Sequence, residues 1–315
     1  MTVTRITSIQ SCTSVGAVIV TYRPDSNTLE ALLRAIQSQV GVIVIVDNTE
    51  SSTHAVDRTV LRLAQQYHAE LIRMGENRGI AAAQNAGVES LNSIPTIEYI
   101  LFFDHDSLPS EAMVASLLDG FFLQSASGHR VGAVGPQIVI PKIKKRIPFL
   151  QISWLRRRRL VCHGATERIR TDHLISSGTL TSKAVFSDVG PFREDLFIDY
   201  VDVEWYLRAI QRGYSLWGIC AATMEHDLGD EPIAIGGQHI FSHSPLRHYY
   251  LVRNAIALYK SPLIPLRWKC SDLPRLVLKS LFYTIFGRPR LAHIRMMGKG
   301  LRDGLAGRMG QLRNM

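Results

Sequence analysis

The sequence predicts an α/β fold in which helices flank a mainly parallel central sheet. Apolar runs rich in β-branched residues alternate with stretches whose apolar residues recur at helical spacing, over residues 16–140. This alternation is typical of βαβ units, which build parallel sheets. Acids and amides follow two of the apolar runs, and ligands of open α/β sheets gather at the carboxyl ends of strands. From Ser242 onward the pattern is helical.

Five strands and four helices are predicted in the first part of the chain. The strands are Gly16–Tyr22, Val42–Asn48, Glu70–Met74, Tyr99–Asp104 and Val131–Ile140. The helices are Ser26–Gln39, Ala55–Tyr67, Ile80–Ser90 and Pro109–Gln124, the last beginning at a proline because proline suits a first helical turn. Further along we expect a strand and turn at Leu174–Leu180, a helix ending at Gly213 and a short strand at Tyr214–Ile219.

Composition points to an anionic partner. The chain has 315 residues, 46% of them hydrophobic, which is enough for one sizeable core. The net charge is +9, and most of the excess lies beyond residue 140. A local positive surface of this kind favours a nucleotide, a nucleic acid or an acidic membrane.

The cysteines and the apolar segments bear on the compartment. Cys12, Cys162, Cys220 and Cys270 form no Cys-x-x-Cys pair, which predicts a reducing compartment and no zinc site. The N-terminus lacks the pattern of a signal peptide, and no uninterrupted apolar stretch is long enough to span a bilayer. We therefore expect a cytoplasmic protein.

The segment ILFFDHDS, Ile100–Ser107, is the strongest indication of chemistry. Four apolar residues lead into Asp104 and Asp106, one residue apart. Two carboxylates at the end of a buried strand repel each other unless a cation lies between them. Mg²⁺ or Mn²⁺ prefers oxygen ligands and commonly bridges to substrate phosphates. The segment predicts a metal–diphosphate site; the alternative is two solvated acids in a turn.

Two further segments offer groups that could bind a nucleotide. Asp47 and Asn48 end the second strand, at the same expected sheet edge as Asp104. Between these strands, ENRGIAAAQNAG opens a helix whose N-terminus can face an anion, and its Asn77, Arg78 and Asn85 are directional donors. An ordinary helix start packed on the sheet would explain the same residues. The first strand is followed neither by the Gly-x-Gly-x-x-Gly turn of dinucleotide-binding proteins nor by a P-loop, so the sequence supports neither of these phosphate-binding motifs.

The second half carries a glycine turn, an acidic cluster and a histidine. Gly178, in LISSGTL, would permit close approach of the backbone to a ligand. Capping could explain one or two of the acids in FIDYVDVEW at a helix start, whereas a poised general base is the sharper interpretation. His226 follows a strand near the same edge and is a possible metal ligand, although a lone histidine is more often structural. The acids of FIDYVDVEW are Asp199, Asp202 and Glu204.

The basic segments predict contact with an anionic surface. Residues 141–171 form a basic insertion that includes the run Arg156–Arg159, although a solvated loop is equally consistent. The C-terminal part combines basic residues with an apolar stripe. It suits an anionic bilayer surface, the catalytic domain or a second subunit. The stripe is Leu278, Leu281, Phe282 and Ile285, and the basic residues that follow are Arg288, Arg290, Arg295, Lys299 and Arg302.

Taken together, these motifs resemble the inverting glycosyltransferases of family 2, which have the GT-A fold. VIVTY, VDN, NRGIAAAQNAG, DHD, SGTL, FIDYVDVEW and the histidine of MEHDLG occur in the family's order over residues 15–255. Within the family the chain is most similar to bacterial rhamnosyltransferases that use dTDP-L-rhamnose to build O-antigen or other surface glycans.

The resemblance implies a role for each matching residue. Thr21, Asp47, Asn48 and Arg78 would line the nucleoside pocket, which Asn77, Asn85, Gly178 and Arg253 would complete. Asp104 would face the ribose and the metal, and Asp106 and His226 would bind the metal. Asp202 would be the catalytic base and Glu204 would support it or the acceptor. Because the family often has adjacent acids where this chain has Val201-Asp202, Asp199 competes for the role of base.

The resemblance also implies a domain plan and partners. Residues 1–240 would form the catalytic domain, with a nucleotide-binding half at 15–140 and an acceptor and base half at 172–240. Residues 241–315 would form a helical region that contacts a membrane or a subunit. The partners would be a nucleotide sugar and a glycan or lipid-linked glycan acceptor, not nucleic acid, with a homo-oligomer also open.

Three rival functions remain open. Transfer of another sugar, such as galactofuranose or glucose, would use the same motifs. A sugar nucleotidyltransferase would need a glycine-rich, lysine-containing phosphate loop, which TYRPDS lacks. A protein that only binds nucleic acid or membrane would not explain the three groups of acids.

Overall fold

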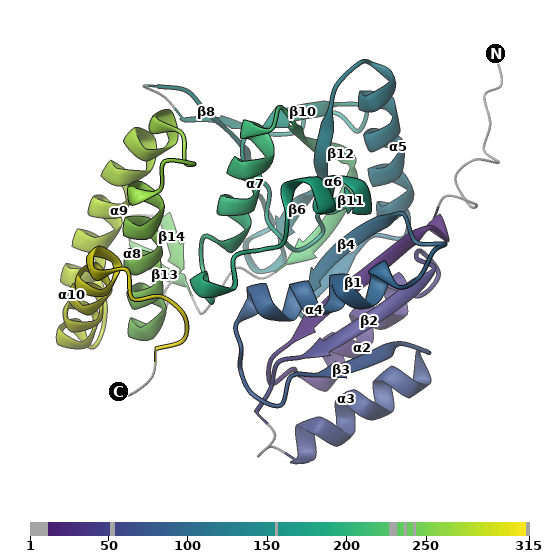
Figure 1. Cartoon of the computed structure of the whole chain (residues 1–315), viewed down its shortest axis with the longest axis horizontal. Coiled ribbons are helices and arrows are strands. Elements are labelled where there is room, and N and C mark those ends of the chain that lie inside the picture. Colours follow the sequence, from purple (N-terminus) through teal and green to yellow (C-terminus); the bar gives the residue numbers. More distant parts are fainter. Residues whose placement is uncertain are drawn as a thin grey trace.

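The computed structural model describes residues 12–50, 54–154, 157–226, 232–235, 238–241 and 244–312. Within these residues a 10-stranded, mostly parallel sheet is flanked by helices. Figure 1 shows the N-terminal strands at one end of the molecule and three C-terminal helices together at the other. The predicted α/β fold is confirmed.

The N-terminal strands form the parallel side of the sheet. Strands β1 (Val15–Thr21), β2 (Val42–Asp47), β3 (Glu70–Arg73) and β4 (Tyr99–Asp104) lie in the order β4-β1-β2-β3. Helices α2 (Ser26–Ile36), α3 (His54–Gln66) and α4 (Ile80–Asn92) connect them. In the register, Thr21 pairs with Asp47 and Val20 with Asp104. The polar residues at the ends of three strands therefore lie side by side, and two of these ends, at Asp47 and Asp104, were predicted to do so.

Side chains of each central strand enter the two hydrophobic layers alternately. In β1, Val18 and Val20 pack in one layer, whereas Ala17 and Ile19 pack in the other. This follows from the two-residue period of a strand. The first layer also contains α4, α6 (Lys183–Val189) and α7 (Val201–Gln211), and the second contains α2, α3 and α5 (Met113–Ala126).

The other half of the sheet is mixed. Strand β12 (Ser215–His226) runs parallel to β6 (Val131–Ile140), and β11 (Leu180–Ser182) lies antiparallel between β6 and β4. The predicted strand at Tyr214–Ile219 was too short. A register shift between Ile219 and Thr223 lets β12 continue along β6 as far as Glu225, and the strand ends at His226.

The predicted helix start at Pro109 was wrong. Residues Ser107–Pro109 form a short strand, β5, that pairs antiparallel with the end of β12. Proline also suits an edge strand, because it has no N–H to pair, and α5 begins only at Met113. The pairing sets Ser107 opposite His226.

The basic insertion is built largely of strands. After a short 3₁₀ turn at Pro141–Ile143, β7 (Lys145–Arg146) pairs with β6, and β8 (Phe149–Ile152) pairs with β9 (Arg157–Leu160). Strand β10 (Arg168–Thr171) extends the main sheet beside β12. Arg156 lies outside the described residues.

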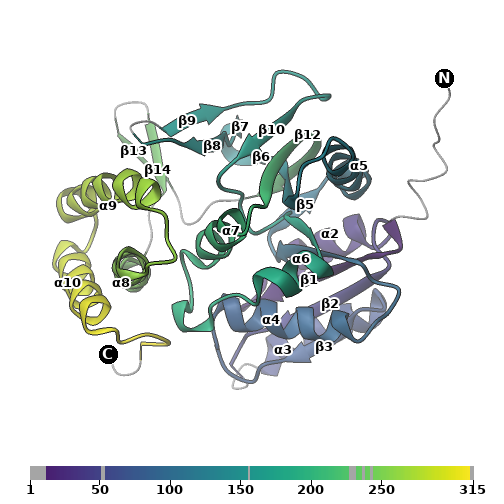
Figure 2. The same ribbon diagram turned by 45° about the horizontal axis from the view of Figure 1, so that its top comes forward.

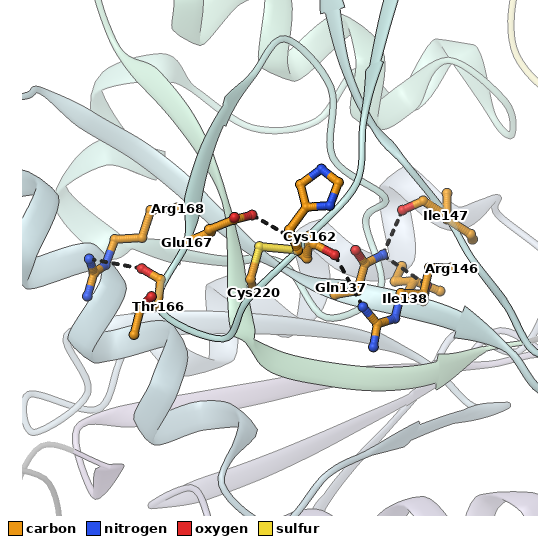
Figure 3. Close-up of a disulfide and its surroundings, with 10 residues drawn as sticks. Gln137, Ile138, Arg146, Ile147, Cys162, Thr166, Glu167, Arg168 and Cys220 are labelled. Carbon is orange, nitrogen blue, oxygen red and sulfur yellow. Dashed lines mark hydrogen bonds between the residues drawn. A yellow bond between two sulfur atoms is a disulfide. The ribbon is translucent and has the colours of Figure 1, made fainter.

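A disulfide joins the insertion to the sheet (Figure 3). Cys162 and Cys220 are bonded, with their Cα atoms 5.6 Å apart, and Arg146 donates to the carbonyl of Cys162. The prediction of a reducing compartment rested on the absence of a local cysteine motif. Because the bonded cysteines are 58 residues apart, the sequence had no local signal for the pair, and the cysteine pattern no longer supports that compartment.

The C-terminal region is helical, as predicted. After the hairpin of β13 (Pro232–Ile235) and β14 (Gln238–Phe241) come α8 (Pro245–Lys260), α9 (Leu266–Phe286) and α10 (Arg290–Ala306). Figure 2 shows α8 facing α7, with α9 and α10 beyond it. Among the described residues, no helix combines the length and apolar character required to cross a bilayer.

Candidate active site

The acidic segment at the end of β4 and the end of β12 meet in one cluster. Ligand atoms of Asp104, Asp106 and His226 all lie within 4.8 Å of one another. His226 Nδ1 lies 3.3 Å from Asp106 Oδ1, and its Nε2 lies 3.8 Å from Asp104 Oδ2. Strand β5 makes this possible, since it turns the chain after Asp106 alongside β12.

The cluster has the donor set for a divalent cation. Two carboxylates and one imidazole suit Mg²⁺ or Mn²⁺. Burial raises the pKa of Asp104. Burial also acts to raise the pKa of Asp106, but the hydrogen bond and charge of His226 outweigh it and lower the pKa overall. The residues therefore fit a bound divalent metal.

A pair of serines supports the histidine. Ser107 Oγ lies 3.1 Å from His226 Nδ1 and 2.6 Å from Ser177 Oγ, and Ser177 Oγ also accepts from the backbone N–H of Asp104. A hydrogen bond to the ring of a metal-binding histidine fixes the orientation of that ring. Neither serine was among the predicted site residues, although Ser107 ends the ILFFDHDS segment and Ser177 lies within the SGTL motif.

Five residues of the predicted nucleoside pocket lie together at the carboxyl ends of β1 and β2 and in the loop before α4. Four of them, Thr21, Asp47, Asn48 and Asn77, are joined through their side chains. Thr21 Oγ1 donates to Asp47 Oδ1 at 2.9 Å, so the ends of β1 and β2 are bonded to each other. Asn48 donates to Asn77 Oδ1 at 3.0 Å and accepts from the backbone N–H of Arg78 at 2.8 Å. Arg78, the fifth, is joined to them through its backbone. The loop before α4 is thereby fixed to the end of β2.

The remaining three residues of the predicted nucleoside pocket, Asn85, Gly178 and Arg253, contact other parts of the protein. The Asn85 amide donates to Phe192 O and accepts from Phe192 N, which ties α4 to the chain before α7. Gly178 has a φ of +81°, and a Cβ there would lie 2.7 Å from Pro136, so its close approach is to protein. Arg253 is buried in α8, where its guanidinium bonds backbone carbonyls. Helical position and residue type alone could not reveal these partners.

Asp202 lies in the first turn of α7 and is the candidate base. Its Oδ1 accepts only from the adjacent Val203 N–H, at 2.8 Å, among the hydrogen bonds of the described residues. Burial raises its pKa, while the nearby His173 imidazole acts in the opposite direction. A carboxylate with a raised pKa and few partners is suited to accept a proton. His173, which no sequence signal indicated, adjoins a cavity of about 150 Å³ lined mainly by apolar side chains.

The other two acids of this segment are committed to cations. Glu204 is buried, and Arg208 Nε donates to it at 3.0 Å. Glu204 is two residues from Asp202 on a helix, so it points to a different face, and among the described residues no hydrogen bond joins the two acids. Asp199 Oδ1 is 3.3 Å from Arg247 Nε. The positive charge of Arg247 also acts to lower the pKa of Asp104, against the larger effect of burial. These pairings favour Asp202 over Asp199 as the base.

Comparison with known proteins agrees with this arrangement. The family described as Glycosyl transferase family 2 matches residues 17–187. The chain is 36% identical to "dTDP-rhamnosyl transferase RfbF" of Shigella flexneri over 256 residues. The aligned region covers 80% of this chain and 82% of that relative.

Solved structures share the fold at low identity. GalNAc-T7, crystallised with UDP, GalNAc and Mn²⁺, is similar over 88% of this chain with a TM-score of 0.56 and 13% identity. S. aureus TarS is similar over 87% of this chain with a TM-score of 0.51 and 12% identity. This chain spans 58% of the former and 44% of the latter.

Proposed function

Because the chain belongs to glycosyl transferase family 2, we propose that it is an inverting rhamnosyltransferase with the GT-A fold. It transfers L-rhamnose from dTDP-β-L-rhamnose to a hydroxyl of a glycan or lipid-linked glycan that becomes O-antigen or a similar surface polymer. The observation that carries the donor assignment is the 36% identity to dTDP-rhamnosyl transferase RfbF over 80% of the chain.

The site residues have distinct roles in this proposal. Thr21, Asp47, Asn48, Asn77 and Arg78 bind and orient the nucleoside at the edge of the sheet. Asp104, Asp106 and His226 would hold Mg²⁺ or Mn²⁺. When bound, that ion offsets the charge of the departing diphosphate.

Asp202 carries out the proton transfer. Its carboxylate takes the proton of the acceptor hydroxyl, and the hydroxyl oxygen bonds to the anomeric carbon as the bond from that carbon to the dTDP oxygen breaks. Attack opposite the leaving group inverts the anomeric configuration, so the β-linked donor gives an α-L-rhamnoside. The proton ends on Asp202, and the bonding electrons leave with dTDP.

A donor comparison tests the proposal. With Mn²⁺ present, dTDP-β-L-rhamnose is expected to raise the melting temperature more than dTDP alone, because a ligand that binds the native state stabilises it. It should also be hydrolysed slowly to dTDP and rhamnose in the absence of acceptor. UDP-galactofuranose and UDP-glucose are the comparators, and turnover of either in place of dTDP-rhamnose would reassign the donor. A nucleotidyltransferase would instead form a nucleotide sugar from a sugar phosphate and a nucleoside triphosphate.

The C-terminal helices offer a surface for an anionic membrane. We include in the proposal that residues 241–315 contact the cytoplasmic face of the cell membrane while residues 1–240 carry the site. On α9, Leu278 is 71% exposed, and on α10 Leu291 is 81% exposed. Basic residues accompany them, and apolar side chains with cations suit the interface of an anionic bilayer. The basic residues on α10 are Arg290, Arg295, Lys299 and Arg302.

Substitution of two leucines tests this surface. Leu278→Glu with Leu291→Glu is expected to weaken binding to phosphatidylglycerol vesicles about tenfold or more, since burying one leucine contributes about 1.5–3 kcal/mol. Leu123→Glu, at a leucine on α5 that is 47% exposed, is the control. Unchanged vesicle binding with a changed oligomeric state in light scattering would assign the surface to a second subunit. Point substitutions are preferable to truncation of the C-terminal helices, because Tyr249 on α8 donates a hydrogen bond to Asp303 on α10 and loss of α10 would disturb α8.

A further inference from the structure

The segment just before the candidate base has an unusual backbone. Phe197, Asp199 and Tyr200 have φ values of +66°, +62° and +63°. Residues other than glycine rarely adopt this left-handed backbone conformation, and they keep it only where the surrounding structure holds them. Residues 195–200, here called the base loop, lead directly into α7 and Asp202. The contacts that hold this loop therefore bear on the position of Asp202.

Two adjacent residues of α8 hold the carbonyls of the base loop. Asn254 is 0% exposed, and its Nδ2 lies 2.9, 2.7 and 2.9 Å from the carbonyl oxygens of Leu196, Ile198 and Asp199. Arg253 is 1% exposed, and its Nη2 donates to Asp195 O and Leu196 O. The guanidinium also donates from Nε and Nη2 to Asn254 Oδ1. Arg253 thus fixes the orientation in which the amide N–H groups face the loop.

The base loop also joins the donor side of the site. Phe197 O accepts from the backbone N–H of Ile80, the first residue of α4, at 2.9 Å. Only glycine fits at position 79, since a Cβ there would lie 2.5 Å from Phe197 O. From its other side, Tyr200 donates to the buried Asp272 of α9 at 2.8 Å. One short loop therefore connects α4, which follows the nucleoside-binding residues, with α7, which carries the base.

We propose that Arg253 and Asn254 are positioning residues that hold the base loop, and with it Asp202, in register with the donor site. The proposal rests on the assignment of Asp202 as the base of the proposed function. Neither residue touches the reacting atoms. Their loss displaces the base from the acceptor hydroxyl while the nucleoside and metal ligands stay in place, so it lowers the rate of transfer and leaves donor affinity nearly unchanged.

Substitution of Asn254 tests the proposal. In Asn254→Ala and Asn254→Asp, the single-turnover rate of transfer at saturating donor is expected to fall about 10²-fold, as a displacement of about 1 Å can cost that much. The dissociation constant for the donor should change little. Asn254→Asp is informative because it preserves the side-chain shape and removes the N–H donors. The matched control is Lys260→Met, which removes a hydrogen bond from the last residue of the same helix to Leu305 O on α10.

A second measurement does not depend on activity. Amide hydrogen exchange at Ile80 and over residues 196–204 should accelerate in the Asn254 variants and not in Lys260→Met. If the Asn254 variants do not fold, Tyr200→Phe loosens the same loop from its Asp272 side and should show the same exchange pattern with a smaller loss of rate.

Three results would overturn the proposal: transfer at the control's rate, a loss of donor affinity equal to the loss of rate, or unchanged exchange over the loop. If the wild type does not use dTDP-rhamnose, the donor assignment fails. The positioning role is then decided by the exchange pattern and by the rate with the donor that the wild type does use.

Discussion

Replacing Asp202 by asparagine is expected to lower the single-turnover rate of sugar transfer by about 10²–10⁴-fold, the usual contribution of a general base. The amide keeps the shape of the side chain but cannot accept the proton of the acceptor hydroxyl. Donor and metal binding should remain, because Asp104, Asp106 and His226 form a separate cluster. Rates at saturating donor separate loss of chemistry from loss of binding.

Asp199→Asn is the matched comparison for this variant. Asp199 lies three residues before Asp202 in the same segment, but its carboxylate is paired with Arg247 at 3.3 Å. We expect Asp199→Asn to retain substantially more activity than Asp202→Asn. An inactive Asp199→Asn together with normal turnover by Asp202→Asn would transfer the role of base to Asp199, and the fold and donor site would be unaffected.

The pH profile gives an independent check on Asp202. Burial raises the pKa of this carboxyl, and His173 only partly opposes the effect. A general base works only when deprotonated, so transfer should decline as the pH falls through this raised pKa. The acid limb of the profile should therefore lie at a higher pH than the pKa of an unperturbed aspartate, which is about 3.9. The limb should be absent from the residual activity of Asp202→Asn, and a limb that persists there would belong to another group.

Asp106→Ala is expected to abolish metal-dependent transfer. The substitution removes one of the three candidate ligands, whose Oδ1 lies 3.3 Å from His226 Nδ1. A metal-assisted displacement loses several kcal/mol of stabilisation without the ion, so the rate should fall by about 10³-fold or more. The stabilisation of the protein against heat by Mn²⁺ with dTDP, which does not require turnover, should also disappear.

The control for this variant is Asp119→Ala, which removes an exposed acid from α5. It should keep both the Mn²⁺ response and the transfer rate. If Asp106→Ala instead turned over normally with Mn²⁺ and showed the wild-type thermal response, the cluster would not be the metal site. Nonspecific binding of Mn²⁺ to surface acids would weaken equally in both variants.

The sequence was sufficient for the features that depend on local pattern. Alternating apolar runs and helical stripes identified the parallel strands β1 to β4 and the helices between them, because each pattern has the period of its own element. The acids at the end of β4 and the polar pair at the end of β2 could be placed at one edge from strand direction alone. The register of Thr21 with Asp47 and of Val20 with Asp104 agrees with that inference.

Features that depend on contacts between distant segments needed the tertiary structure. The sequence allowed His226 to be either a structural histidine or a metal ligand. Its place beside Asp104 and Asp106 depends on the register shift in β12 and on the pairing of β12 with β5. Cys162 and Cys220 form a disulfide across 58 residues, for which the sequence carries no spacing signal. Asn85 and Arg253 can donate hydrogen bonds to a bound nucleotide or to the protein itself, and the sequence does not distinguish the two. Whether they face a ligand or the carbonyls of Phe192 and Leu196 depends on which helix faces meet. Local periodicity fixes which face of an element is buried, but only packing decides what lies against it.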